Sequence, residues 1–545
     1  MVSDLSDAIR SWTAAIGGDH VELASGPLKM AETATFRTSA RVYAILRPGT
    51  TEEVQACVRI ANRHRVPLHP VSSGKNWGYG SRSPVRDGVL IDLRRLNRIR
   101  ELNTELAYVT LEAGVTQRQL HELLRTKAPS LWMDATGASP DCSIVGNTME
   151  RGFGHTPMGD HASTACGLEV VLPNGELITT GYGQFESSGA TPISRAGVGP
   201  ALDGLFLQSN LGIVTSMTVW LMPAPEHFEA FFFLCDDENG LAPIVDALRP
   251  LKLNGTLRSV LHIGNDYKVL AGSGSFPWSL TGGKVLDATT MAGLRKKFGL
   301  AAWTGAGGLY GTRGQVREAR RQVKRALAGK VNQLRFMDDR RMDLLWRWAK
   351  PLGIVMRRDF VRMLTLLRPV YDLLKGIPTD STIGSAYWRK RDAAPKDGQC
   401  DPDRDGCGLL WCAPVVPMTG AALSEVTALA SSVVLERGFE PQMSISLATD
   451  RMAICVITIT YDRLEAGADE AAMSCYRSLT EQLHQRGYPL YRRNVAAMHV
   501  APESPAYAGL LRDLKSALDP NAILAPGRYE PVAAVTHPSA VRRGA

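Results

Sequence analysis

Hydrophobic positions alternate with turn residues in the first part of the chain and follow a helical spacing more often in the second part. In the first part, the stretches VPLHPVS (66–72) and GVLIDL (88–93) each predict a strand. GLEVVLPNGELITT (167–180) predicts two strands joined at Pro-Asn-Gly, and SNLGIVTSMTVWLMP (209–223) predicts a long strand that ends at Pro223. Residues 38 to about 225 are therefore expected to form a strand-rich unit with tight turns.

Short helical patterns alternate with the strands of this unit, and longer helices become more frequent after it. TTEEVQACVRIANRHR (50–65) combines a threonine cap, early acids and apolar residues at helical spacing. Further helices are predicted over 286–299, 314–328, 421–437 and 466–486, and ALDPNAILAPGRYEP (517–531) returns to the turn-rich pattern. This organisation predicts a nucleotide-holding domain, an inserted substrate domain that starts at about residue 226, and a C-terminal segment that returns to the first domain.

Composition narrows the class of protein. A length of 545 residues with 44% hydrophobic and 21% charged residues is typical of a globular protein with two domains. No run approaches the roughly 18 apolar residues of a membrane helix, so we expect no membrane partner. MVSDLSDAIRSW lacks the apolar core of a secretory signal, so we expect a cytoplasmic protein. The nine cysteines are scattered, and Cys400, Cys407 and Cys412 lack a histidine pair at ligand spacing. We therefore expect neither a disulfide framework nor a metal site.

The net charge of +8 comes from dispersed basic residues, which argues against a nucleic-acid partner. The densest basic run, VREARRQVKRALAGK (316–330), lies on a predicted helix. Its basic residues fit a solvated helix face, and an acidic protein that docks there is the alternative.

Two glycine-rich segments are the strongest signs of chemistry. PVSSGKNWGYG occupies residues 70–80, and SPDCSIVGNTMERGFGHTPMGDH occupies residues 139–161. Glycine lets the backbone lie close to a ligand, and its N–H groups can converge on an anion. The first segment alone fits an ordinary surface turn equally well. Two such segments in one domain favour a long ligand that contains a pyrophosphate, although neither matches a Rossmann fingerprint or a P-loop in context.

These motifs resemble those of the vanillyl-alcohol oxidase and p-cresol methylhydroxylase flavoproteins. The likeness rests on PVSSGKNWGYG, TPMGDH, GLEVVLPNGELI, LDGLFLQSNLGIVTSMTVWLMP and DPNAILAPGRY, and KGIPTDSTIGSAYWR and GYPLYRR extend it into the second domain. It implies an α+β fold with a p-cresol methylhydroxylase-type FAD-binding domain, which comprises residues 1–225 and the C-terminal segment 495–545. The α/β cap domain (226–494) would cover the flavin ring. The likeness also implies that FAD is bound by Ser72, Ser73, Gly74, Lys75, Asn76, Gly78, Gly146, Asn147, Gly152, Gly154, Gly212 and Ile213.

The resemblance further implies four catalytic residues. Tyr79, Tyr491 and Arg492 match residues that hold a substrate phenol as its phenolate, and Asp160 matches a carboxylate beside flavin N5. Each has a structural alternative: a tyrosine in the core, an arginine at the surface, or an aspartate that caps a following helix.

Departures from the family pattern concern the flavin linkage and the fate of the product. Relatives attach FAD covalently through His or Tyr in the strand that matches CGLLWCAP (407–414), or through His in the first glycine loop. The first of those places is occupied here by Leu409 or a near neighbour, and the second by Ser73, Gly74 and Lys75. We therefore expect FAD to be bound non-covalently, and a covalent bond to Cys142 is the alternative. Thr382 replaces a glutamate of the alcohol oxidase, and Ala453 and Ile454 replace a histidine-containing site.

These matches predict an FAD-dependent oxidoreductase that removes a benzylic hydride from a para-substituted phenol and forms a p-quinone methide. One alternative is an oxidase or dehydrogenase of a non-phenolic alcohol or natural-product intermediate, and another is a flavin-free binding protein with the same fold. The expected electron acceptor is oxygen or an electron-carrier protein, and the expected assembly is a homodimer.

Overall fold

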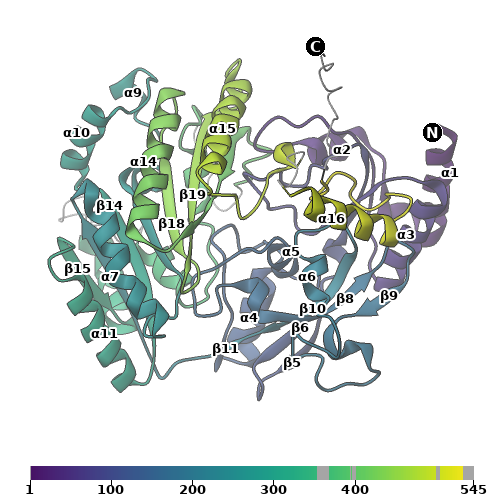
Figure 1. Ribbon diagram of the computed structural model, residues 1–545, viewed down its shortest axis with the longest axis horizontal. Coiled ribbons are helices and arrows are strands. Elements are labelled where there is room, and N and C mark those ends of the chain that lie inside the picture. Colours follow the sequence, from purple (N-terminus) through teal and green to yellow (C-terminus); the bar gives the residue numbers. More distant parts are fainter. Residues whose placement is uncertain (1, 353–366, 393–394, 396–399, 499–503, 532–545) are drawn as a thin grey trace, which may run out of the picture.

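The computed structural model describes residues 2–352, 367–392, 395, 400–498 and 504–531. Figure 1 shows two halves side by side: a half that carries the first strands together with α16, and a half built on a long sheet covered by helices. The described residues thus combine helices with separate sheets, as expected for an α+β protein.

The first half contains two sheets. The smaller sheet has the strand order β1-β2-β4-β3, and α3 connects β2 to β3. Thr50 caps α3 by accepting a hydrogen bond from the Glu53 backbone, and Val54, Cys57 and Val58 are buried on its inner face, as the sequence pattern predicts. The bounds are β1 (Val21–Glu22), β2 (Val42–Leu46), α3 (Thr51–His64), β3 (Leu68–Val71) and β4 (Gly88–Asp92).

The larger sheet of this half is antiparallel, with the order β5-β6-β10-β8-β9. β8 and β9 pair across the turn that contains Gly175, where φ is +81°, which confirms the predicted hairpin. The bounds are β5 (Ile99–Asn103), β6 (Tyr108–Glu112), β8 (Ala165–Val171), β9 (Leu177–Thr179) and β10 (Ile213–Trp220).

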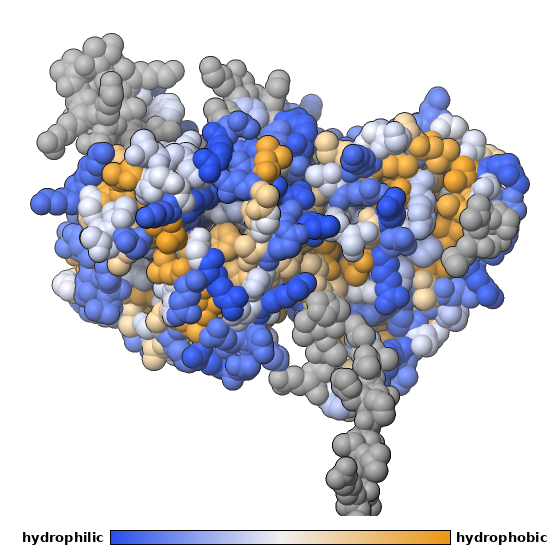
Figure 2. Space-filling model, turned by 90° about the horizontal axis from the view of Figure 1, so that it is seen from above, coloured by the Kyte–Doolittle hydropathy of each residue, from blue (hydrophilic) through white to orange (hydrophobic). Residues whose placement is uncertain are grey.

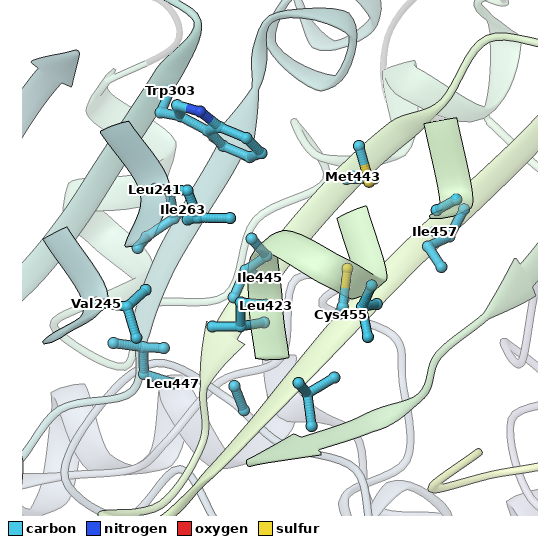
Figure 3. Close-up of a cluster of buried hydrophobic side chains, with 14 of the residues drawn as sticks. Leu241, Val245, Ile263, Trp303, Leu423, Met443, Ile445, Leu447, Cys455 and Ile457 are labelled. Carbon is cyan, nitrogen blue, oxygen red and sulfur yellow. The ribbon is translucent and has the colours of Figure 1, made fainter. Parts of the chain in front are cut away.

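The second half is built on an eight-stranded sheet with the order β15-β12-β14-β13-β18-β19-β16, in which β17 also pairs with β19. Alternation along β18 places Met443, Ile445 and Leu447 in the hydrophobic core beneath the helices, as Figure 3 shows. The residues between them, Ser444 and Ser446, face a cavity. The bounds are β12 (His227–Cys235), β13 (Leu261–Asn265), β14 (Trp303–Gly311), β15 (Gln333–Met337), β16 (Cys407–Cys412), β17 (Val415–Pro417), β18 (Gln442–Leu447) and β19 (Met452–Asp462).

Amphipathic helices cover one face of this sheet (Figure 1). Their bounds lie within two residues of the predicted ranges for three of them: α11 (Arg313–Leu327), α14 (Gly420–Glu436) and α15 (Ala468–Gln485). The basic run on α11 is partly neutralised, because Arg320 pairs with Glu229 at 2.8 Å and Arg321 pairs with Glu318. These ion pairs and the contact of Arg320 with the Phe336 ring favour a structural role for this face.

The C-terminal segment returns to the first half. The Leu68 backbone donates to Ile523 O at 2.7 Å and accepts from Ala525 N at 2.8 Å, so residues 523–525 lie beside β3. The buried Lys515 ammonium, on α16 (Pro505–Leu518), donates to Asn210 O at 2.9 Å. These contacts place the described part of the C-terminal segment against the first half, and the domain boundaries stay a prediction.

The other elements are short or peripheral. They are α1 (Val2–Ile16), η1 (Gly18–His20), α2 (Ser25–Glu32), η2 (Leu93–Arg95), α4 (Gln117–Lys127), β7 (Leu131–Trp132), α5 (Ile144–Met149), η3 (His161–Thr164), η4 (Gly181–Gln184), α6 (Asp203–Phe206), β11 (Met222–Pro223), η5 (Glu238–Gly240), α7 (Leu241–Leu253), α8 (Asp266–Gly272), α9 (Trp278–Thr281), α10 (Ala288–Phe298), α12 (Asp339–Leu352), η6 (Ile383–Tyr387) and η7 (Val495–Ala497). Figure 2 shows hydrophobic residues interspersed with hydrophilic ones on one face of the molecule. Within the described ranges, none of the helices combines the length and the apolar character needed to cross a bilayer.

Candidate active site

A cavity of about 390 Å³ lies between the two halves. Its walls come from the two glycine-rich segments, from β13, β18 and β19 of the long sheet, and from the C-terminal segment through Arg528. Three parts of the chain that are far apart in sequence therefore meet at one site.

The first glycine-rich segment turns sharply at the edge of the cavity. Gly74, Gly78 and Gly80 have φ values of +69°, +77° and +117°, which favour glycine. A Cβ on Gly78 would lie 2.8 Å from the ring of Trp411, so this glycine also permits a close contact with the cap. The segment is thus a shaped loop, and the surface-turn alternative does not describe it.

The second glycine-rich segment packs against the first. Ser143 N donates to Ser73 Oγ at 3.0 Å, and a Cβ on Gly146 would lie 2.2 Å from Ser72 Oγ. Gly146 therefore allows the two loops to approach closely and leaves a groove of backbone and small side chains, which fits the extended pyrophosphate of FAD. Ten of the twelve residues expected to bind FAD line the cavity: Ser72, Ser73, Gly74, Lys75, Asn76, Gly146, Asn147, Gly152, Gly212 and Ile213.

The other two residues expected to bind FAD support the walls. The carbonyl of Gly78 accepts a hydrogen bond from Trp411 N at 3.2 Å, and the carbonyl of Gly154 accepts one from His262 Nε2 at 3.2 Å. Both glycines thus connect the first half to strands of the cap. The binding of FAD by Gly78 and Gly154 stays a prediction.

The positions at which a covalent flavin bond is expected in this family hold neither His nor Tyr. Leu409 is buried against Trp77 and Ile383, and Ser73, Gly74 and Lys75 provide neither His nor Tyr. Cys142 lines the cavity, but burial raises the pKa of its thiol to about 12, which disfavours the thiolate. These features support the prediction of non-covalent FAD.

Tyr79, Tyr491 and Arg492 meet at one side of the cavity. The Tyr79 and Tyr491 hydroxyls lie 3.4 Å apart, and the Arg492 guanidinium lies 4.3 Å from the centre of the Tyr79 ring. Burial raises the pKa of Tyr79 well above its ordinary value, so its hydroxyl stays a hydrogen-bond donor. We refer to these three residues as the phenolate cradle, because they bring two hydroxyls and one cation to one place.

A buried carboxylate that the sequence did not suggest holds the cradle in position. Glu150 Oε2 lies 3.0 Å from Arg492 Nε and accepts a hydrogen bond from the Tyr529 hydroxyl at 2.8 Å. Arg528 also pairs with Glu150. Burial raises the pKa of Glu150, but Arg528 and Arg492 outweigh it and hold the pKa below its ordinary value. Glu150 therefore stays ionised between two arginines.

Asp160 is half-buried and does not line the cavity. Its side chain makes no capping hydrogen bond to η3, so the helix-cap alternative is not supported. The buried carboxylate in this region is Asp134, which accepts from Thr156 N and from His161 Nε2 at 2.6 Å each. Asp134 thereby fixes the TPMGDH segment, whereas the role of Asp160 at the flavin stays a proposal.

The cap contributes a polar wall opposite the glycine loops. His262 on β13 stacks on His155 with ring centres 4.1 Å apart, and its Nδ1 lies 3.0 Å from Ser446 Oγ. Burial lowers the pKa of both histidines, so they are neutral at pH 7. Lys268 on α8 adds a cation to the same wall. Buried and cavity-facing residues alternate along β13 and β18, and this alternation could have identified the wall from sequence once both strands had been predicted.

Comparisons with known proteins agree with this geometry. Residues 42–181 match a family model described as an FAD binding domain. The chain is 42% identical to 1'-carboxy-chondrochloren decarboxylase of Chondromyces crocatus over 96% of this chain and 97% of the relative. It is 31% identical to the 4-cresol dehydrogenase [hydroxylating] flavoprotein subunit of Pseudomonas putida over 96% of this chain and 95% of that protein. The chain belongs to the p-cresol methylhydroxylase family of FAD-dependent oxidoreductases.

Solved structures of this family have the same fold. p-Cresol methylhydroxylase with substrate bound has a TM-score of 0.86 at 29% identity, covering 97% of this chain and 98% of that chain. The 4-ethylphenol oxidase of Gulosibacter chungangensis, in its isoeugenol complex, has a TM-score of 0.87 at 26% identity with the same coverage. The predicted family, the FAD cofactor and the α+β fold with a p-cresol methylhydroxylase-type FAD-binding domain are thereby confirmed.

Proposed function

We propose that this FAD-dependent oxidoreductase removes a benzylic hydride from a para-substituted phenol. The observation that carries the proposal is the phenolate cradle, in which Tyr79, Tyr491 and Arg492 converge on the cavity. Ionising a phenol of pKa near 10 at pH 7 needs about three pK units, or roughly 4 kcal/mol, of selective stabilisation. One arginine contact and two hydroxyl donors in a buried site can supply this amount.

FAD, when bound, supplies the acceptor for the hydride. The cradle's part is to hold the phenolate, so that electron density from its oxygen moves through the ring as the hydride leaves the para benzylic carbon. Loss of the hydride from a 4-alkylphenol gives a p-quinone methide, which water converts to an alcohol. If the substrate is already a benzylic alcohol, the product is a carbonyl compound. Asp160 is proposed to act as a base or charge beside flavin N5, and the acceptor of the electrons is proposed to be oxygen or an electron-carrier protein.

The relative that decarboxylates a carboxylated natural product suggests a second outcome for the same intermediate. If the carbon next to the benzylic carbon carries a carboxylate, the quinone methide can lose CO2. The electron pair of the broken C–C bond then forms a new double bond to the benzylic carbon, and the exocyclic pair returns to the ring as phenolate. The net change is a two-electron oxidation of substrate, with FAD as oxidant, that yields a hydroxystyrene and CO2.

Anaerobic mixing with a 4-alkylphenol, followed by admission of air, tests the proposal. We expect the visible flavin absorption to bleach with the phenol and to stay unchanged with its O-methyl ether, because the ether cannot form a phenolate. Return of the absorption in air would identify oxygen as an acceptor. Equal bleaching by the phenol and the ether would contradict the phenolic mechanism and favour a non-phenolic alcohol. Absence of flavin from the purified protein would favour a binding role.

A further inference from the structure

Lys268 is a half-buried cation that lines the cavity. It lies in the first turn of α8, directly after β13, and Asn265 Oδ1 accepts from its backbone N–H at 3.0 Å. Its neighbours Asp266 and Tyr267 point elsewhere, since Asp266 pairs with Arg295 and the Tyr267 hydroxyl donates to Leu286 O. Of these three side chains, only that of Lys268 lines the cavity.

The ammonium of Lys268 has a neutral partner. Its Nζ donates to Ser385 Oγ at 3.3 Å, and within the described ranges no carboxylate forms an ion pair with it. By contrast, the buried Lys390 pairs with Asp462 at 3.0 Å, and the buried Lys515 pairs with Asp519 at 2.7 Å. A buried charge is costly unless an opposite charge compensates it. Lys268 therefore presents an unbalanced positive charge to whatever occupies the cavity.

The surroundings favour a substrate anion over the cofactor. The loops expected to hold the FAD pyrophosphate belong to the first half, whereas Lys268 belongs to the cap wall that also carries His262 and Ser444. The phenolate cradle lines the same cavity and has its own arginine. A substrate with a phenol at one end and an acid on its side chain would place one anion at each cation.

We infer that Lys268, which is held by Ser385, forms a carboxylate-binding subsite, and that the substrate is a para-substituted phenol whose side chain carries an acid group. This inference rests on the proposed function and makes Lys268 a specificity residue. An ion pair to the carboxylate stabilises the bound substrate but does not help CO2 to leave. Lys268 should thus govern affinity for the acid more than the limiting rate.

The test compares 3-(4-hydroxyphenyl)propanoate with its amide in the FAD-loaded enzyme. Anaerobic stopped-flow reduction of the flavin at increasing ligand concentration gives a Kd and a limiting rate for each ligand. We expect the wild type to bind the acid about tenfold to a hundredfold more tightly than the amide, the range for a hydrogen bond to a charged group. In Lys268→Met the two Kd values should become similar, and Lys268→Arg should keep most of the preference.

Lys252→Met is the matched control. Lys252 also has a neutral partner, Ser259 O at 2.9 Å, and desolvation lowers the pKa of both lysines to about 8. Unlike Lys268, Lys252 does not line the cavity. The preference for the acid should persist in this variant. FAD content, measured as flavin per protein, should be the same in Lys268→Met as in the wild type.

The pH dependence of the wild type provides a test that needs no variant. The ratio of the two Kd values should fall towards one as pH rises above about 8, because deprotonated Lys268 no longer attracts the carboxylate. The elements packed around α8 contribute His262 from β13, Tyr310 from β14 and Tyr387 from η6, whereas β18 contributes no titratable group. Burial lowers the pKa of His262 and raises those of both tyrosines, so none of these groups changes charge near pH 8.

The inference would be overturned if the wild type bound acid and amide with equal affinity, or if the preference for the acid survived in Lys268→Met. Loss of FAD from Lys268→Met would also overturn it, because Lys268 would then belong to the cofactor site. If both ligands reduce the flavin but bind equally, the carboxylate subsite is wrong while the phenol mechanism stands. If neither phenol reduces the flavin, the proposed function and the inference are both wrong.

Discussion

Replacing Glu150 by glutamine tests whether this carboxylate maintains the phenolate cradle. The Glu150 side chain is 14% exposed and lies between Arg492, at 3.0 Å, and Arg528. At that distance and an effective dielectric constant of about 20, one ion pair is worth about 5 kcal/mol before desolvation. Breaking a buried pair by removing one partner costs about 3–5 kcal/mol. Because glutamine keeps the size and some hydrogen bonds, we expect a loss of about 3 kcal/mol in the free energy of unfolding.

The loss should depend on pH in a defined direction. The pKa of Glu150 is lowered in the folded protein, so its stabilisation is present above the unfolded pKa of about 4.3 and disappears as pH falls through the lower folded pKa. The difference between wild type and Glu150→Gln should therefore be full at pH 7 and shrink below about pH 4. Denaturant midpoints followed by tryptophan fluorescence and flavin release measure it.

Glu112→Gln is the matched control for this prediction. Glu112 is a carboxylate that is 1% exposed and pairs with Arg98 and Arg100, but it does not line the cavity. It should lose stability to a similar extent without a change in affinity for a 4-alkylphenol, whereas Glu150→Gln should also bind the phenol more weakly. Unchanged stability of Glu150→Gln, or a loss of equal size at every pH, would refute the reasoning.

Three further predictions concern the flavin and the cradle. Asp160→Asn should slow flavin reduction by about a hundredfold, the range for a positioned acid–base group, with FAD content nearly unchanged; a normal reduction rate would remove Asp160 from the mechanism. Acid precipitation should release the yellow flavin into the supernatant, and fluorescence of the protein band on a denaturing gel would instead show a covalent bond. Arg492→Lys should retain part of the turnover with a 4-alkylphenol, because it keeps the charge but loses the planar fork; complete retention would show that only charge matters.

Local sequence signals were sufficient for the FAD-binding half. The threonine cap and spacing of 50–65, the Pro-Asn-Gly turn and the two glycine segments are local features, and each forms the predicted element. The strands of the cap were harder to predict from sequence. In a short strand such as QMSISL, the alternation of residues does not reveal which side is buried until the neighbouring strands are known. The eight-stranded sheet was therefore not predicted strand by strand.

The site shows the same limit. Tyr79, Tyr491 and Arg492 could be named because they lie in motifs that resemble those of a known family. Glu150 lies in the second glycine-rich segment, but neither it nor Lys268 was predicted as a site residue. Their importance comes from partners far away in the sequence, Arg492 and Ser385. Long-range pairing of this kind depends on tertiary packing, which no local pattern in one sequence specifies.

The optical spectrum of a bound phenol tests the central claim most directly. A para-hydroxyaromatic ligand that the flavin cannot oxidise should be bound to the wild type at pH 7 as its phenolate, because the cradle brings a cation and two hydroxyls together at one side of the cavity. A difference spectrum should then show phenolate absorption with the wild type and not with Arg492→Ala. A ligand that stays a neutral phenol in the wild type, together with turnover that is indifferent to O-methylation of the substrate, would contradict the account.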